Sequence, residues 1–173
     1  MSKVALVTGG SGALGSAIVR RLRKDDVSVA FTFKTNQTAA EAVANEAGAI
    51  AFQADLADSQ QVKDVVHQVV ERFGPIDILV NNVGLTQVMP FALIEEEDWD
   101  EVMAANLKTM FLVTREVARG MVARKAGVII NIGSLAGHRV LEVPVHYATA
   151  KAGVSGFTLS LAREFARYNI RVN

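Results

Sequence analysis

Short apolar runs alternate along the chain with longer stretches of helical spacing. The runs are rich in Val, Ile and Leu and occupy residues 4–7, 27–33, 49–52, 76–80 and 128–132. The helical stretches occupy residues 14–24, 37–47, 59–73, 98–124 and 147–167. Near-continuous apolar runs are typical of parallel strands that are covered on both faces, and strands alternating with helices form βαβ units. The pattern therefore predicts a single α/β domain over residues 1–173, with a doubly wound parallel sheet.

The ends of the predicted elements carry their own signals. Ser59 precedes a run of apolar positions and is predicted to cap the third helix, which Gly74 and Pro75 end. Residues 169–173 read as the opening of a sixth strand. A strand that begins and stops leaves a short, poorly protected sheet edge, so we expect the fold to be incomplete at that point.

Composition narrows the classes of function. Hydrophobic residues make up 50% of the chain, and 18 Lys and Arg balance 18 Asp and Glu. No overall positive field is present to attract nucleic acid or an anionic membrane, so we expect neither partner. The absence of cysteine excludes disulfides, thiolate nucleophiles and cysteine-based zinc sites. No apolar run approaches the roughly 20 residues that span a bilayer, which favours a cytoplasmic globular protein.

The histidines offer no metal site at the level of sequence. His67, His138 and His146 show no metal-ligand spacing with a second convincing ligand. His67 lies on a helix face and is expected to be solvated. His138 and His146 flank the segment that enters the last helix, where contact with a substrate is a lesser alternative to a structural role.

A glycine-rich segment, residues 8–15, joins the first predicted strand to the first helix. Gly9, Gly12 and Gly15 allow a tight turn and a close approach of backbone to a pyrophosphate at the positive end of a helix. Ser11 could donate to a phosphate or bond its own backbone. No lysine follows the last glycine, which argues against a P-loop nucleotidase. The segment thus predicts dinucleotide binding.

The end of the second strand bears on the choice of dinucleotide. An acidic residue there would accept hydrogen bonds from the ribose hydroxyls of NAD. The chain has Lys34 instead, followed by Thr35 and Asn36. A cation beside donor groups suits a 2′-phosphate, which predicts a preference for NADP(H) over NAD(H). The alternative is that Lys34 is an ordinary solvated loop lysine.

Tyr147 and Lys151 stand four residues apart in the last predicted helix, so their side chains should leave it on one face. A nearby cation stabilises a phenolate, and such a pair can serve in acid–base catalysis. Alone, a Tyr and a Lys at this spacing are mostly structural. Further motifs extend the pattern: residues 81–84 (Asn-Asn-Val-Gly) after the fourth strand, Asn106 in the helix that follows, and Ser134 after the fifth strand.

Taken together with the glycine loop, these residues resemble the short-chain dehydrogenase/reductase family over essentially the whole chain. The resemblance implies that Tyr147 is the general acid, that Ser134 hydrogen-bonds the substrate carbonyl, and that Lys151 binds the nicotinamide ribose. It also implies that Asn106 holds a water in a proton relay and that Asp55 contacts the adenine. The implied cofactor-binding set is Gly9, Ser11, Gly12, Leu14, Gly15, Lys34, Asp55, Leu56, Asn82, Gly84, Tyr147 and Lys151. Two departures stand out, Ala13 in place of a glycine and Val83 in place of an alanine.

Within the family, residues 82–86, 97–99 and 132–134 resemble the 3-oxoacyl-[acyl-carrier-protein] reductases of fatty-acid synthesis. The implied activity is NADPH-dependent reduction of a carbonyl to an alcohol. The alternatives are a reductase for another ketone, a polyketide or a sugar, and a non-catalytic nucleotide-sensing protein on the same fold. The resemblance further implies a homodimer or homotetramer formed through helices 98–124 and 147–167. It also implies a C-terminal segment, beyond residue 173, that covers the substrate and supplies a last strand.

Overall fold

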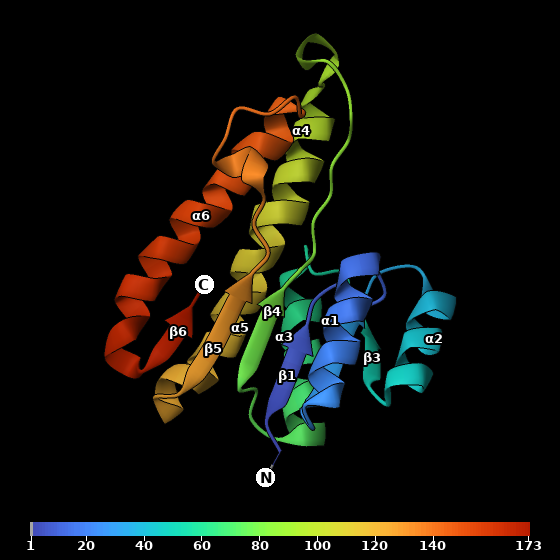
Figure 1. Cartoon of the computed structure of the whole chain (residues 1–173), viewed down its shortest axis with the longest axis vertical. Helices are drawn as coiled ribbons and strands as arrows, with labels where there is room; N and C mark the ends of the chain where they lie inside the picture. The colour runs from blue at the N-terminus through green and yellow to red at the C-terminus, as the bar shows by residue number, and fades with distance from the viewer. Residues whose placement is uncertain (1) are drawn as a thin grey trace.

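The computed structural model describes residues 2–173 and has a six-stranded parallel sheet at its centre (Figure 1). Its strands are β1 (Val4–Val7), β2 (Ser28–Phe33), β3 (Ile50–Gln53), β4 (Ile78–Asn81), β5 (Gly127–Asn131) and β6 (Ile170–Val172). They lie in the order β3-β2-β1-β4-β5-β6, and every neighbouring pair is parallel. The order reverses between β1 and β4, which is the arrangement of a doubly wound Rossmann sheet. The predicted fold class is therefore confirmed.

Helices connect successive strands. The α-helices are α1 (Ala13–Lys24), α2 (Gln37–Ala47), α3 (Ser59–Phe73), α4 (Glu96–Met103), α5 (Thr109–Arg124) and α6 (Val145–Phe165). Shorter turns are η1 (Phe91–Leu93), the π-helical η2 (Ala104–Lys108), η3 (Leu135–Gly137) and η4 (Ala166–Tyr168).

Two predicted helix features were wrong. The side chain of Asp58, not Ser59, caps α3 by accepting from the backbone N–H groups of Gln60 and Gln61. The stretch predicted as one helix over residues 98–124 is instead α4 and α5 joined by the π-helical η2. A π-turn inside a helix changes a few backbone hydrogen bonds from i→i+4 to i→i+5 and has no characteristic residue type, so apolar spacing over the long stretch does not locate it.

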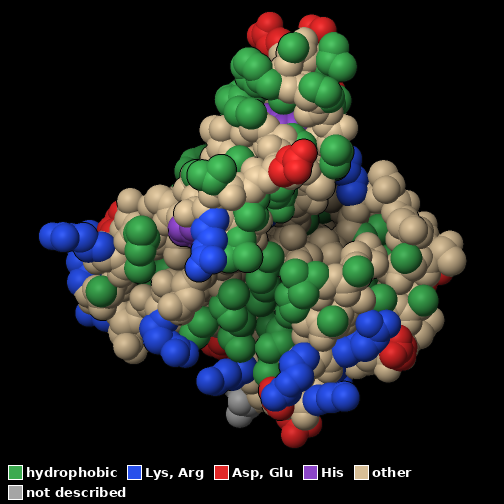
Figure 2. Space-filling model, turned by 45° about the horizontal axis from the view of Figure 1, so that its top comes forward, with side chains coloured by type: hydrophobic (Ala, Val, Ile, Leu, Met, Phe, Trp, Pro, Cys, Tyr) green, Lys and Arg blue, Asp and Glu red, His purple; other side chains and the backbone are tan. Residues whose placement is uncertain are grey.

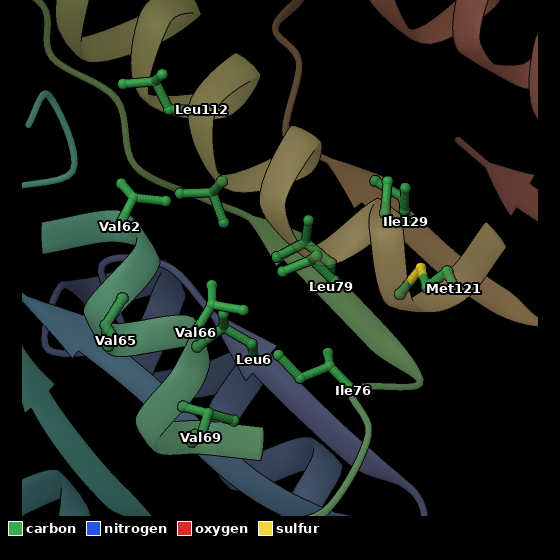
Figure 3. Close-up of a cluster of buried hydrophobic side chains, with 14 of the residues drawn as sticks. Leu6, Val62, Val65, Val66, Val69, Ile76, Leu79, Leu112, Met121 and Ile129 are labelled. Carbon is green, nitrogen blue, oxygen red and sulfur yellow. The ribbon is translucent and has the colours of Figure 1, made fainter. Parts of the chain in front are cut away.

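Two apolar cores lie on opposite faces of the sheet. One packs α3 and α5 against the strands and includes Leu6, Val66, Leu79, Met121 and Ile129 (Figure 3). The other packs α1 and α2 against β1 and β2 through buried side chains that include Val7, Val19, Phe31 and Val43. The strands in the middle of the sheet are thus covered on both sides, as their continuous apolar sequences predict.

The carboxyl ends of the strands meet along one edge of the sheet. Register pairs Phe33 of β2 with Gln53 of β3, and Asn81 of β4 with Asn131 of β5. The segments that follow these strands therefore lie close together, although they are far apart in the sequence. Within residues 2–173, none of the helices has both the length and the apolar character needed to cross a bilayer.

Candidate active site

A cavity of about 760 Å³ opens at the carboxyl edge of the sheet. Figure 2 shows a recess beneath the projecting loops. Segments from the β1–α1 turn, from the ends of β2 to β5, and from α6 line the cavity. Every residue predicted to bind cofactor lies in its lining: Gly9, Ser11, Gly12, Leu14, Gly15, Lys34, Asp55, Leu56, Asn82, Gly84, Tyr147 and Lys151.

The glycine turn has the tight geometry that its sequence predicts. Gly9 adopts φ of 64°, and a Cβ atom on Gly15 would lie 2.2 Å from the carbonyl oxygen of Gly9. Asn82 Nδ2 donates to the carbonyl oxygens of Thr8 (2.9 Å) and Gly9 (3.2 Å), which fixes the turn to the end of β4. The first turn of α1 carries no acidic side chain, so its positive end faces the cavity uncompensated. This cradle fits a pyrophosphate.

Lys34 and Asp55 form an ion pair at one end of the cavity. Lys34 Nζ lies 2.9 Å from Asp55 Oδ2. The hydrogen bond from Lys34, followed by one from the backbone N–H of Ala57, holds the pKa of the Asp55 carboxyl below its ordinary value. The same pair raises the pKa of Lys34. Sequence reasoning treated the two residues separately and missed their pairing.

Tyr147 and Lys151 lie at the other end, on the same face of α6 as predicted. Lys151 Nζ is 5.8 Å from the centre of the Tyr147 ring and donates to the carbonyl oxygen of Ile132 at 2.9 Å. Burial of the ammonium lowers the pKa of Lys151, because desolvation penalises the charged form. A buried amine beside a phenol is suited to proton transfer.

Asn106 stands behind this pair in the π-helical η2. Its Nδ2 donates to the carbonyl oxygens of Leu85 and Val102, each at 2.8 Å, while its Oδ1 is buried and has no partner among the described residues. A Cβ atom on Gly84 would lie 2.9 Å from Asn106 Oδ1 and 3.3 Å from Lys151 Nζ. Both polar atoms therefore lie close to Gly84, where a side chain would clash with Asn106, and the buried Asn106 Oδ1 is left to accept from a group that these residues do not supply.

Ser134 follows β5 and caps η3, where its Oγ accepts from the backbone N–H of Ala136 at 3.1 Å. Its neighbour Gly133 lines the cavity, whereas Ser134 and Asn106 do not. Ser134 is thus next to a lining residue in the sequence but is not itself part of the lining. His146 is fully buried, which favours its structural role over contact with a substrate.

A family model for short chain dehydrogenases matches residues 3–173. The chain belongs to the short-chain dehydrogenase/reductase family. It is 41% identical to an acetoacetyl-CoA reductase of Paracoccus denitrificans, with 100% of this chain and 72% of the relative covered. It is 38% identical to the 3-oxoacyl-[acyl-carrier-protein] reductase FabG of Staphylococcus aureus, with the same two coverages, 100% and 72%.

Solved structures of family members have nearly the same fold as this chain. A single-substitution variant of actinorhodin polyketide ketoreductase with NADPH has a TM-score of 0.95 at 37% identity, covering 99% of this chain and 68% of that one. A double mutant of a Serratia marcescens short-chain dehydrogenase/reductase has a TM-score of 0.93 at 37% identity, covering 99% and 71%. The family and these relatives identify the chain as an NAD(P)-dependent ketoreductase of the short-chain dehydrogenase/reductase type.

The cavity of this family member also includes side chains that sequence reasoning did not select. Glu101 on α4 lies in the lining, and its Oε2 accepts from Gln87 Nε2 at 2.7 Å. Thr86 and Thr109 line the same space. Glu101 follows a predicted helix start by only a few residues, and nothing in its sequence position distinguished it from the other acidic residues there.

Among residues 2–173, no three histidine or carboxylate side chains gather closely enough to hold a metal ion.

Proposed function

We propose that the chain reduces the 3-oxo group of an acyl thioester to an alcohol with NADPH, as a 3-oxoacyl-[acyl-carrier-protein] reductase does. One observation carries the proposal: Tyr147 and the buried Lys151 share one end of a cavity whose other end holds the glycine cradle and Lys34. Relatives named FabG and acetoacetyl-CoA reductase, both of which act on 3-oxoacyl thioesters by name, support this class of substrate.

The nicotinamide cofactor, when bound, supplies a hydride to the carbonyl carbon. Tyr147 would donate its hydroxyl proton to the carbonyl oxygen, and Lys151 would hold the ribose hydroxyls with its ammonium. The Ser134 oxygen already accepts from Ala136 N, so its hydroxyl hydrogen is free to bond the substrate carbonyl. Asn106 Oδ1 would accept from a water that returns protons from solvent towards Lys151.

Reduction of acetoacetyl-CoA by NADPH, followed by the loss of nicotinamide absorbance, tests the activity. Tyr147→Phe should lower the rate by roughly 10²- to 10⁴-fold, because it removes the proton donor and keeps the ring. Its NADPH dissociation constant should stay close to that of the parent. A Phe variant that keeps a rate near the parental value would show that another group is the acid.

The cofactor proposal rests on Lys34, the cation that lines the adenosine end of the cavity. The parent should bind NADPH more tightly than NADH, and Lys34→Asp should reverse that order by adding repulsion to lost attraction. Fluorescence titration of both cofactors measures the two constants. Equal constants in the parent would contradict a preference for NADPH.

The similarity to a polyketide ketoreductase with bound NADPH favours a second candidate substrate, a polyketide ketone. A panel containing acetoacetyl-CoA and a bulky cyclic ketone would rank the two by kcat/KM.

We further propose that the chain is one domain and that it assembles as a dimer or tetramer through α4 with α5 and through α6.

A further inference from the structure

The Lys34–Asp55 pair is created by the register of the sheet. β2 and β3 end side by side, and the backbone N–H of Ala54 donates to the carbonyl oxygen of Phe33 at 2.9 Å. Lys34 follows Phe33 and Asp55 follows Ala54, so the two side chains start close together. The Lys34 ammonium nitrogen lies 2.9 Å from a carboxylate oxygen of Asp55.

The two partners differ in how firmly they are held. Asp55 Oδ1 accepts from Ala57 N at 3.0 Å, and Asp55 N donates to Gln61 Oε1 at 2.8 Å. The Lys34 side chain is 66% exposed, against 35% for Asp55, and extends on a flexible stem. The carboxylate is thus the fixed member of the pair, and the ammonium is the member that can move.

Charge around Lys34 is unfavourable for an anion. The charged side chains in the cavity lining are Lys34, Asp55, Glu101 and Lys151. Lys151 belongs to the catalytic end. The hydrogen bond and charge of Asp55 are the main causes of the raised pKa of Lys34, and the charge of Glu101 adds a smaller effect in the same direction. The Lys34 ammonium is therefore already paired with the Asp55 carboxylate before any anion binds. A phosphate monoester adds a charge of about −1.5 to −2 at neutral pH.

We propose that Asp55 competes with the 2′-phosphate of NADPH for the Lys34 ammonium and so limits the preference of the chain for NADPH over NADH. The inference rests on the proposed use of a nicotinamide cofactor. NADH carries a 2′-hydroxyl and can bind while the pair stays intact. NADPH must draw the ammonium away from a fixed carboxylate, which an exposed ion pair permits at modest cost.

Asp55→Asn tests this competition, because it removes the charge and keeps an oxygen that can accept from Ala57 N. Dissociation constants for NADPH and NADH are measured by fluorescence titration at low and at physiological salt. The ratio of NADPH to NADH affinity should rise roughly threefold to tenfold at low salt and less at higher salt. Any lost adenine contact affects both cofactors alike and cancels in the ratio.

Glu46→Gln is the matched control. It breaks another exposed ion pair, Arg20–Glu46 at 2.7 Å, outside the cavity lining, and should leave the ratio unchanged. Lys34→Met should lower the ratio of NADPH to NADH affinity. In that background Asp55→Asn should change the ratio little, because no ammonium remains for which Asp55 could compete. If the amide variant does not fold, Asp55→Ser repeats the test with a smaller acceptor.

An unchanged ratio in Asp55→Asn would overturn the inference. A rise that persists in the Lys34→Met background would also overturn it, since Asp55 would then repel the phosphate directly. A parent chain that binds neither cofactor would defeat the proposed function as well. A parent that binds both, with no effect of Asp55→Asn, would defeat only the competition.

Discussion

Two lysines in one cavity show how strongly the surroundings of a residue decide its chemistry. Asp55 raises the pKa of Lys34, whereas burial lowers the pKa of Lys151. The sequence selected both as cofactor residues, because each stands at a position with a recognisable motif. It could not predict that one would be paired and the other desolvated. Those properties depend on which strand ends are neighbours and how deeply α6 packs.

Burial of Lys151 makes a prediction about stability. Its folded pKa lies below the unfolded value of about 10.4, so the unfolded chain binds the proton more tightly in the interval between the two. Below the folded pKa of Lys151, the buried ammonium lowers the free energy of unfolding. This loss of stability disappears as pH rises towards about 10.4, where the side chain is neutral in the folded chain.

Thermal unfolding of the parent and of Lys151→Met, compared between pH about 7.5 and about 10, measures this effect. The parent should gain stability relative to the Met variant as pH rises, because the other titrating groups are common to both. A difference in Tm that does not vary with pH would show that the fold imposes no desolvation cost on this ammonium.

Predicted elements agree with the structure where local pattern determines them. The bounds of β1, α2 and α3 match the predicted ranges, since each is a clear apolar run or carries a distinct end signal. The π-helical η2 was not predicted, although it carries Asn106. The cap of α3 was assigned one residue too late, because Asp58 and Ser59 are both good capping residues and sequence does not rank adjacent ones.

The β1–α1 turn makes a prediction at the same scale. Gly15→Ala places a Cβ atom 2.2 Å from the carbonyl oxygen of Gly9, a clash with backbone that no side-chain rotation relieves. The turn must shift, which should cost about 1–3 kcal/mol of stability and weaken cofactor binding. Calorimetry and cofactor titration measure the two effects.

Gly156→Ala is the control for that substitution. Gly156 lies on α6, and a Cβ atom there would meet nothing within 4 Å. Alanine in an open helical position should raise the stability of the monomeric chain by roughly 0.5–1 kcal/mol, so the comparison is made where the chain is monomeric, because Gly156 lies one turn from Leu159 on α6. If both variants had the same Tm, the close approach at Gly15 would not be a constraint of the fold.

At the scale of the molecule, the strand order places the site. Because the order reverses between β1 and β4, the loops after these strands diverge and leave the cavity at the carboxyl edge. The glycine loop and the family resemblance were sufficient to predict many of the lining residues, and the alternation of strands and helices predicted the fold that brings them together. The sequence did not predict Glu101, which reaches the cavity through the packing of α4, or the 38% exposure of Ile130 on β5.

Assembly is the remaining prediction for the whole chain. Leu159 on α6 is 72% exposed and Phe111 on α5 is 44% exposed, partly covered by the Arg115 guanidinium at 5.3 Å from its ring centre. In a symmetric dimer each such patch would meet its own copy.

Light scattering should report a dimer or tetramer at micromolar concentration, and Leu159→Lys should shift it towards monomer by placing a charge in the contact. Val70→Lys, at an exposed valine on α3 that lies outside the proposed contact, should leave the mass unchanged. A parent chain that is monomeric at that concentration, or a Leu159→Lys variant that assembles like the parent, would exclude α6 as the interface.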